Sequence, residues 1–489
     1  MKNNRIAVLG FGKTGQALLE FLLANEAQAS VVLFNDGAIV DTARREFFER
    51  RGVHFLIGAE KFAELNDCRL VIISPGFDGK NPRFTDLRAQ GVRIISEIEY
   101  AFSNLKQINL VKKQDNLLSK LLIPPLQGTS LRSRVGRMRS KVIAVSGSNG
   151  KSTTVSLIHH LLAKAGRRSV LAGNIGVPFI AQVREIGADS IVVLELSSFQ
   201  LEEIVDFRAD VAVLLNITPD HLDRYPSMEA YAAAKYNLFT NQRPGDHMVL
   251  NADDPLLRDA KRLGAGKPLW FSSTRALPDG AFLQGQGLTL RAAAAEEKIS
   301  LRRNPLRGIH NLENIMAAAL ACRAIGLTAA EIESGLESFQ GLAHRMEAAG
   351  TIGGVEFIND SKATNVDAAL KSIASIDGRL VVILGGKDKG SDFSALEKIL
   401  KKKALRVLLL GKAAPLIAGQ LPSLEKRLAH VRDLTEAVRS GYELLQPQGG
   451  TVLLAPACAS FDMFDNFEHR GDVFKREVAS LREQVQAHG

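Results

Sequence analysis

The sequence predicts an α/β protein with three domains, each built on a largely parallel β-sheet. Short apolar strands alternate with amphipathic helices along the chain, and this alternation is typical of parallel sheets. Two of the strands run into glycine-rich turns that open helices, at residues 10–15 and 146–153. The length of 489 residues suits three domains of roughly 150 residues each.

The composition is that of an ordinary globular protein. Hydrophobic residues make up 46% and charged residues 24% of the chain, and no stretch reaches the ~18 unbroken apolar residues of a transmembrane helix. The start, MKNNRIAVLGFG, runs directly into an apolar strand and has no secretory signal pattern. Cys68, Cys322 and Cys458 lie too far apart for a disulfide framework or a zinc cluster, so we expect reduced thiols and a cytoplasmic protein.

The net charge of +9 comes almost entirely from one segment. Nine basic residues and one acidic residue lie between Lys106 and Lys141, which leaves a net charge of +1 for the rest of the chain. The positive charge therefore indicates an acidic partner, if any, for this one segment and not for the whole protein. Residues 104–140 also carry Pro, Gly and Ser and break the α/β pattern, which predicts a linker. The alternative is a weak contact of residues 107–138 with an anionic surface.

The first predicted unit spans residues 1–103. Its strands are RIAVLG, SVVLFND, RLVIISPG and VRIISEIE, and the helix GKTGQALLEFLLAN follows the first strand. Residues 10–15 form a literal G-x-G-x-x-G between strand and helix, where glycines let backbone N–H groups approach a diphosphate. Asp36 is the candidate acid for a ribose hydroxyl. The motif predicts a Rossmann-like unit. On its own it is compatible with an NAD-dependent dehydrogenase, and a turn that needs glycine for packing is the alternative.

The second predicted unit spans residues 141–342 and opens with the strand KVIAVSG. The loop SGSNGKST then precedes the helix TTVSLIHHLLAKAG. The usual P-loop pattern needs glycine where Val145 stands, and the nearest glycine is Gly147. Even so, the helix N-terminus and Lys151 suit a phosphate group, and the Ser152 hydroxyl suits Mg²⁺. A surface turn that happens to contain a lysine is the alternative.

Polar residues follow two further strands of this unit. Glu195 follows SIVVL, and His221 comes after DVAVLLNITPD. Ligands bind at the carboxyl ends of parallel strands, and a carboxylate with an imidazole suits a divalent cation. A structural role is the alternative for each residue.

Lys235 is predicted to lie on the apolar face of a helix. Its helical neighbours are Tyr231, Leu238 and Phe239. Such a lysine either extends its amine to the surface or functions with a depressed pKa.

The third predicted unit spans residues 343–489. It is built around LVVILGG, RVLLLG and GTVLLAPA, and its boundary falls just after Gly341. It is predicted to be a second Rossmann-like unit.

Ten motifs, in order along the chain, carry a resemblance to the Mur ligase family. They are GSNGKST, GNIG, LELSSFQLE, NITPDHLDRY, AAK, HNLEN, HRME, INDSKATN, LGGKDKGSDF and PACASFDMFDNFEHRG. The resemblance covers nearly the whole chain apart from residues around 107–138. It implies that the short loop starting at Gly147 is the family's own form, within a central sheet of the P-loop ATPase type. Ser148 stands where threonine is commoner.

The resemblance implies an ATP-dependent ligase of cytoplasmic peptidoglycan precursor synthesis, and hence a role in cell wall biogenesis, cell shape and cell division. ATP would phosphorylate the carboxylate of UDP-N-acetylmuramoyl-L-alanine, and the amine of D-glutamate would attack the acyl phosphate. Because this step gathers negative charges, cations must converge on it. The implied cofactors are ATP, Mg²⁺ at two sites and CO₂ as a lysine carbamate. We also expect a monomer, no nucleic-acid partner and no stable membrane insertion.

The resemblance also implies roles for individual residues. Those implied for ATP are Gly147, Ser148, Asn149, Gly150, Lys151, Ser152, Thr153, Asn311, Asn314, Arg345 and Asp360. Those implied for the metal sites are Ser152, Glu195, His221 and Lys235, the last as carbamate, and the catalytic set is Lys151, Glu195, His221 and Lys235. Those implied for the UDP substrate are Gly12, Lys13, Thr14, Asp36, Ser74, Pro75, Gly76, Asn174 and Ser197. Those implied for D-glutamate are Thr364, Lys389, Ser460 and Phe467, supported by Lys362 and Asn365.

Other proteins share parts of this pattern. Sister Mur ligases and folylpolyglutamate synthase have the central loop, but the synthase normally lacks the N-terminal unit. A dehydrogenase would leave the second phosphate loop unused. A non-catalytic regulator would lack the pocket to which Thr364, Lys389 and Ser460 belong.

Overall fold

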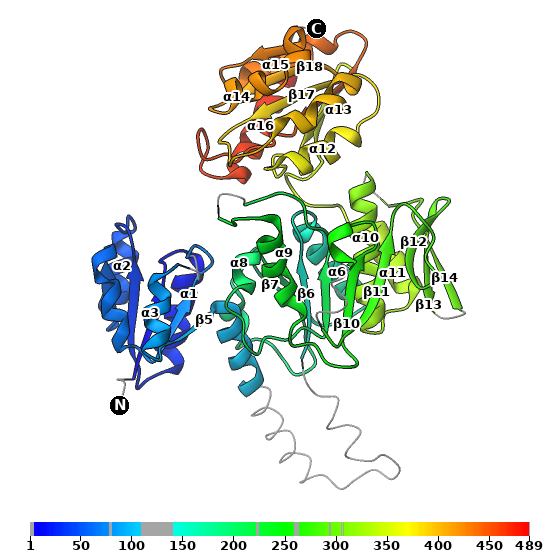
Figure 1. Ribbon diagram of the computed structural model, residues 1–489. Helices are drawn as coiled ribbons and strands as arrows, with labels where there is room; N and C mark the ends of the chain where they lie inside the picture. Colours follow the sequence, from blue (N-terminus) through cyan, green and yellow to red (C-terminus); the bar gives the residue numbers. More distant parts are fainter. Residues whose placement is uncertain are drawn as a thin grey trace.

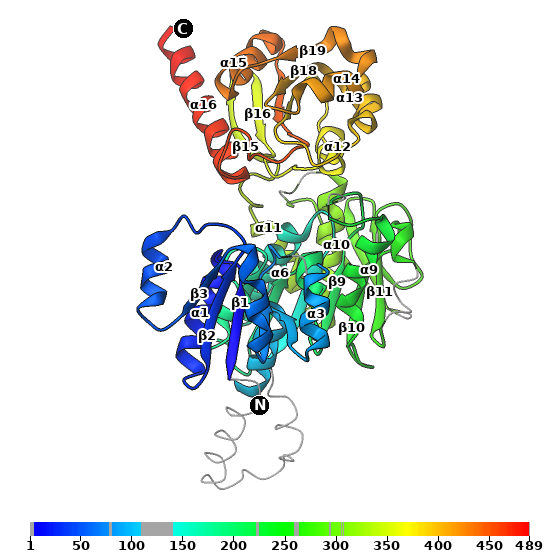
Figure 2. The same cartoon turned by 60° about the vertical axis from the view of Figure 1, so that its left-hand side comes forward.

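The computed structural model describes residues 4–77, 81–108, 140–221, 224–258, 264–292, 295–304, 306 and 308–488. These residues form three α/β domains in chain order, which confirms the predicted fold class (Figures 1 and 2). The basic segment 107–138 lies almost wholly outside the described residues. No helix in the described part of the chain is long and apolar enough to cross a membrane.

The N-terminal domain is a five-stranded parallel sheet in the order β3-β2-β1-β4-β5. Its strands are β1 (Arg5–Leu9), β2 (Ser30–Asn35), β3 (His54–Ile57), β4 (Leu70–Ile73) and β5 (Arg93–Ser96). Its helices are α1 (Lys13–Asn25), α2 (Thr42–Glu49), α3 (Arg83–Ala89) and a 3₁₀ helix (Ala59–Asp67). Since β1 lies between β2 and β4, the strand order reverses beside the glycine-rich turn, where such sheets bind ligands.

The predicted strand VRIISEIE is shorter than expected. It ends at Ser96, and residues 97–108 are helical, so residues 104–108 of the predicted linker belong to a helix. The physical reason is local, because the Ser96 hydroxyl accepts the N–H of Glu99 and caps this helix. The helix packs on the central domain, with the rings of Phe102 and Phe207 5.2 Å apart.

The central domain is a nine-stranded sheet in the order β14-β13-β12-β11-β10-β9-β6-β8-β7. Its strands are β6 (Lys141–Ser146), β7 (Ser169–Gly173), β8 (Ile191–Glu195), β9 (Val211–Leu214), β10 (His247–Asn251), β11 (Lys267–Ser272), β12 (Gly280–Gln284), β13 (Gly287–Ala292) and β14 (Ala295–Ser300). Its helices are α6 (Lys151–Lys164), α7 (Phe179–Gln182), α8 (Ser198–Leu201), α9 (Met228–Tyr236), α10 (Ile309–Ala324), α11 (Ala329–Ser338) and the 3₁₀ helices Asn237–Phe239 and Pro255–Leu257. The pairs from β7 to β12 are parallel, whereas β12, β13 and β14 form an antiparallel edge that the sequence did not predict.

The C-terminal domain is a six-stranded sheet in the order β15-β16-β20-β17-β18-β19, parallel except for β15. Its strands are β15 (Glu347–Ile352), β16 (Val355–Asn359), β17 (Leu380–Gly385), β18 (Ala404–Leu410), β19 (Leu428–His430) and β20 (Gly450–Leu454). Its helices are α12 (Val366–Ala374), α13 (Glu397–Lys403), α14 (Ala414–Gln420), α15 (Leu434–Leu445), α16 (Phe467–His488) and the 3₁₀ helices Phe393–Leu396 and Pro422–Arg427. In Figure 1 this domain lies above the central one, with α12 on the side that faces it.

Two buried carboxylates join the N-terminal and central domains. One Glu99 oxygen accepts three successive backbone N–H groups, from residues 205, 206 and 207, at 2.8, 2.9 and 2.8 Å. Glu97 accepts the N–H of Ile180 at 2.7 Å. These bonds hold the first sheet beside the second.

Candidate functional site

The phosphate loop connects β6 to α6, as the sequence predicted. Gly150 has φ of +86°, and a Cβ there would collide with the Asn314 side chain, so the position requires glycine. Lys151 is the first residue of α6, and its Nζ donates to the carbonyl oxygens of Gly147 and Ser148 at 2.7 and 2.8 Å. The free N–H groups at the start of α6 and this amine make the loop suited to an anion.

The loop opens into a cavity of about 270 Å³ that lies between the central and C-terminal domains. Seventeen of the predicted and supporting residues line it: Ser148, Asn149, Gly150, Lys151, Ser152, Thr153, Asn174, Glu195, His221, Asn311, Asn314, Arg345, Asp360, Lys362, Thr364, Asn365 and Lys389. The structure thus brings residues from motifs more than 200 positions apart into one space.

Glu195 lies at the end of β8 and is 3% exposed. Its Oε1 accepts from Asn174 Nδ2 at 2.8 Å, while Oε2 is buried with no hydrogen-bond partner among the described residues. A buried carboxylate oxygen without a donor is costly, and a cation would satisfy it. This observation fits the expected Mg²⁺ site.

The other predicted metal ligands do not form a ready-made cluster with Glu195. Within the described ranges, no group of three or more His, Cys, Asp and Glu side chains forms a ready-made metal site. His221 has φ of +57°, its ring lies edge-on to Phe199 at 4.9 Å, and its Nε2 is 3.7 Å from Asp220 Oδ2. A metal at this site would therefore depend on the Ser152 hydroxyl and on a modified Lys235 as well.

Lys235 is buried, with 1% of its surface exposed. Its Nζ donates to the carbonyl oxygen of Gly147 at 3.0 Å and lies 4.5 Å from the centre of the Tyr231 ring. Burial, and next the charge of Lys151, lowers the pKa of Lys235 well below its ordinary value. The alternative in which the amine reaches the surface is wrong, because the nitrogen lies in the interior.

The C-terminal domain contributes a second group of cations. Arg345 Nη2 donates to the Ser152 hydroxyl at 2.9 Å across the domain boundary. Burial, and next the charge of Arg345, lowers the pKa of Lys362 to about 8. Asp360 accepts from the N–H of Met346 at 3.3 Å, and burial raises its pKa.

The predicted D-glutamate residues are only partly assembled. Thr364 and Lys389 line the cavity, whereas Ser460 and Phe467 do not. Ser460 is buried at 2% exposure, and Phe467 lies beneath the Lys362 amine, 3.5 Å from nitrogen to ring centre.

The predicted UDP-substrate residues fall into separate places in the N-terminal domain. Asp36 and Gly76 line a cavity of about 400 Å³, where Asp36 pairs with Arg83 at 3.1 Å. Ser74 and Pro75 line a much smaller neighbouring hollow. Gly12, Lys13 and Thr14 lie at the start of α1 and line neither cavity. In the central domain, Ser197 is an N-cap, accepting the N–H of Gln200 at 3.3 Å.

The cavity also contains residues that the sequence reasoning missed. They are Asn216, Asp220, His310, Glu313, Met346, Ala363, Ala368, Lys371 and Ser372. Asn216 and Asp220 follow β9 directly, and the strand-end argument that selected Glu195 would have selected them too. His310 and Glu313 stand in the HNLEN motif beside Asn311 and Asn314 on α10, so that motif was a signal for them. Lys371 has no such signal, because only domain packing brings α12 to the cavity.

Comparison with known proteins gives matches over most of the chain. Residues 4–96 match the model of the "Mur ligase MurD-like, N-terminal domain", residues 145–322 that of the "Mur ligase middle domain", and residues 344–458 that of the "Mur ligase, glutamate ligase domain". A protein of Alkaliphilus metalliredigens named UDP-N-acetylmuramoylalanine--D-glutamate ligase is 36% identical over 488 residues, covering 99% of each chain. One with the same name from Solibacter usitatus is 39% identical over 477 residues, covering 98% of each.

Solved structures share the fold. The MurF ligase of Thermotoga maritima in complex with ADP aligns with a TM-score of 0.56 at 17% identity, over 98% of this chain and 96% of that one. UDP-N-acetylmuramate-alanine ligase MurC from the same organism aligns with a TM-score of 0.54 at 19% identity, over 97% and 99%.

Proposed function

Because the chain belongs to the Mur ligase family, we propose that it joins D-glutamate to UDP-N-acetylmuramoyl-L-alanine at the expense of ATP. The observation that carries the proposal is the single cavity in which the phosphate loop meets Thr364 and Lys389 of the C-terminal domain. The full-length relatives leave no role for the dehydrogenase alternative, since the N-terminal glycine turn belongs to the ligase architecture as well.

The reaction has two steps. A carboxylate oxygen of the alanyl group attacks the γ-phosphorus of ATP, forming an acyl phosphate and releasing ADP. The D-glutamate amine, having lost a proton, then attacks the acyl carbon, forming the amide and expelling phosphate.

Lys151 and Arg345 supply positive charge where phosphate charge gathers. Lys151 projects from the loop itself, and Arg345 reaches Ser152 from the opposite domain. Preorganised cations of this kind stabilise developing charge in a site from which water is excluded. The third domain must therefore be seated for the first step to proceed.

The unpartnered Glu195 oxygen, the Ser152 hydroxyl and His221 would hold Mg²⁺, in two sites if Lys235 carries a carbamate. Bound Mg²⁺ supplies charge neutralisation to the phosphate groups. Lys235 has a property that favours carbamate formation, since its lowered pKa favours the neutral amine, which is the form that adds CO₂.

The two other substrate sites follow from charge and position. Lys389 pairs with Asp220 at 3.9 Å, and a carboxylate of D-glutamate would be a better partner for its amine. Thr364 would donate from its hydroxyl beside it. The cavity at Asp36 and Gly76 would bind the uridine part of the other substrate. Ser460 and Phe467, which do not line the central cavity, would act on D-glutamate indirectly, by stabilising the loops of its site. We further propose a cytoplasmic monomer.

An amino-acid panel tests the function directly. ATP-dependent phosphate release with UDP-N-acetylmuramoyl-L-alanine should require D-glutamate, with L-glutamate, L-alanine, L-lysine and no amino acid as comparisons. Preference for another amine would assign the chain to a sister ligase. A change in NADH absorbance on addition of the protein would instead support the dehydrogenase alternative.

The basic segment is proposed to be a linker without a catalytic role. Replacing 107–138 by a short Gly/Ser linker should leave ligation within a few-fold of the parent rate. Sedimentation with anionic vesicles at low and high salt separates the linker from a surface contact, because only the contact gives salt-sensitive binding that the deletion removes. A hundredfold loss of ligation would instead assign the segment to the catalytic machinery.

A further inference from the structure

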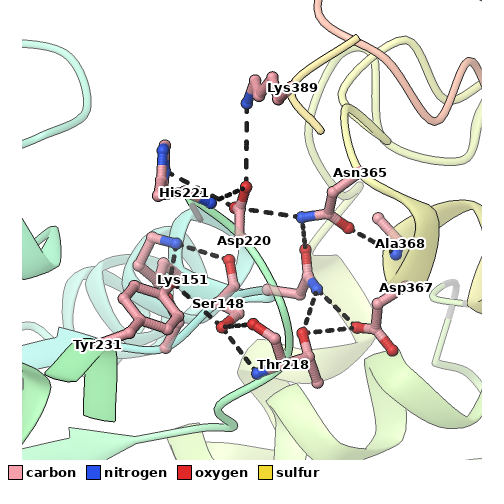
Figure 3. A network of polar contacts seen from close by, with 12 residues as sticks. Ser148, Lys151, Thr218, Asp220, His221, Tyr231, Asn365, Asp367, Ala368 and Lys389 are labelled. Carbon is pink, nitrogen blue, oxygen red and sulfur yellow. Dashed lines mark hydrogen bonds and ion pairs between the residues drawn. The ribbon is translucent and has the colours of Figure 1, made fainter. Parts of the chain in front are cut away.

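The first turn of α12, in the C-terminal domain, lies against the phosphate loop of the central domain. Asp367 Oδ2 accepts from Asn149 Nδ2 at 2.6 Å and from the Thr218 hydroxyl at 3.2 Å (Figure 3). Lys371, one turn along α12, pairs with the same oxygen at 3.1 Å. Asp367 lies two residues after the motif INDSKATN and does not line the cavity.

Asn149 connects this carboxylate to the nucleotide site. It lies inside the loop, between Ser148 and Gly150, and lines the cavity. Its backbone is held within the central domain, because its N–H donates to Asn216 Oδ1 at 2.9 Å and its carbonyl oxygen accepts from Asn216 Nδ2 at 3.1 Å. Its side chain makes one bond within the central domain, from Nδ2 to the Thr218 hydroxyl at 3.3 Å, and two to the other domain, to Asp367 at 2.6 Å and from Asn365 Nδ2 at 3.3 Å.

The two sets of bonds respond differently to movement of the C-terminal domain. The bonds to Asn216 persist whether or not the domains are together, whereas those to Asp367 and Asn365 exist only when α12 is seated. The Asp367 bond is short and charge-assisted, and such bonds are about twice as strong as neutral ones. Domain closure therefore adds the stronger of the bonds that orient the Asn149 side chain to the longer bond with Thr218.

We propose that Asp367 is a positioning residue that orders the phosphate loop through Asn149 when the C-terminal domain closes. ATP then meets an ordered loop only in the domain arrangement that also presents Thr364 and Lys389. The inference rests on the proposed function, since it concerns ATP in the first step of the ligation. It assigns to Asp367 a part in nucleotide binding without contact with the nucleotide.

Asp367 also has a purely structural explanation. It lies in the first turn of α12, where a carboxylate stabilises the helix dipole and pairs with a lysine four residues later. That role predicts a loss of stability that does not depend on Asn149. A double-mutant cycle separates the two explanations.

The experiment measures binding of a non-hydrolysable ATP analogue with Mg²⁺ to the full-length chain by calorimetry, for the parent, Asp367→Ala, Asn149→Ala and the double variant. We expect Asp367→Ala to weaken binding about tenfold in the parent and less than about twofold in the Asn149→Ala background. Asp367→Asn keeps an acceptor oxygen and should fall between the parent and Asp367→Ala. The matched control is Asp377→Ala, which removes a fully exposed carboxylate from the same domain and should change nothing.

Each other outcome overturns the inference. Equal losses in both backgrounds would leave Asp367 with the helix-stabilising role alone, and tighter binding in Asp367→Ala would mean that its charge repels ATP. If the variants bind as the parent does while the parent still ligates D-glutamate, the inference fails and the proposed function stands. If the parent binds no ATP analogue, both fail.

Discussion

Two lysine side chains share one acceptor at the centre of this site. The carbonyl oxygen of Gly147 accepts from Lys151 Nζ at 2.7 Å and from Lys235 Nζ at 3.0 Å. Burial lowers the pKa of both amines, and the charge of Lys151 lowers that of Lys235 further. Lys235 is affected more strongly, which fits a charged Lys151 for phosphate beside a neutral Lys235 for CO₂.

Lys151→Ala tests the first of these roles. We expect phosphate release to fall by about a hundredfold or more, because the loop loses the only mobile charge it projects toward the nucleotide. The matched control is Lys164→Ala, at the exposed C-terminal end of the same helix, which should keep the parent rate. Near-normal turnover of Lys151→Ala would remove the loop from the ATP site.

Lys235→Ala tests the second role. We expect nearly complete loss of turnover and partial recovery on addition of acetate, which would occupy the place of the carbamate. In the parent, CO₂-depleted buffer should lower the rate, and the loss should deepen as the pH falls because protonation removes the reactive amine. The exposed Lys398 offers a control substitution. Parent-like activity of Lys235→Ala in CO₂-depleted buffer would exclude the carbamate.

At the scale of elements, the phosphate loop is shaped by its fit against α10. Gly150 precedes α6 and lies against Asn314 of α10, which in turn accepts from the Thr154 hydroxyl at 3.2 Å. Loop, helix α6 and helix α10 therefore form one packed unit. A side chain at residue 150 has no room in it.

Gly150→Ala should weaken binding of the ATP analogue at least about tenfold and cost about 1–3 kcal/mol of stability, from strained backbone and a collision with Asn314. Gly166→Ala is the matched control. It lies just after the same helix with φ of +67°, but its added Cβ would meet nothing within 4 Å. It should lose only the stability that a non-glycine residue costs at positive φ, and its nucleotide binding should be unchanged. Calorimetry and thermal unfolding of both variants distinguish a loop effect from a general loss of stability.

At the scale of the whole molecule, the contact between the N-terminal and central domains contains a titrating group. Burial raises the pKa of Glu97 from 4.5 to about 7, against the opposing bond from Ile180. Its Oε2 has no hydrogen-bond partner in the described part of the chain. Between pH 4.5 and pH 7 the folded chain holds a proton here that the unfolded chain has lost. Ionisation of Glu97 therefore opposes folding, and the cost is fully present above pH 7.

Glu97→Gln should remove this cost, because the amide oxygen still accepts the Ile180 N–H and carries no charge. The variant should match the parent near pH 4.5 and become more stable by up to ~3 kcal/mol above pH 7. Thermal unfolding midpoints from pH 5 to pH 8 measure the difference. Glu46→Gln, at an exposed position on α2, should give a difference that does not change with pH in this range. A flat profile for Glu97→Gln would mean that its carboxyl is not strained by burial.

The sequence by itself determined the fold class and the local shape of the phosphate loop. Both depend on contacts between near neighbours, since an apolar strand, a glycine turn and an amphipathic helix form wherever these residues follow one another. The strand ends that carry Glu195 and His221 were found for the same reason. The antiparallel edge β12–β14 was not predicted, because its form depends on partner strands. The helix at 97–108 did have a local signal, the cap from Ser96 to Glu99, which the apolar strand pattern before it obscured.

Only the tertiary structure decided the rest. The burial of the Lys235 amine, the meeting of Arg345 with Ser152 and the bond from Asn149 to Asp367 each join residues far apart in the chain. No local periodicity encodes them, because they arise from the packing of α9 against the phosphate loop and from the contact of one domain with another. The sequence shows the chemical type of each residue. Its pKa and its hydrogen-bond partners depend on the burial and the charges around the side chain, and these are set by the whole fold.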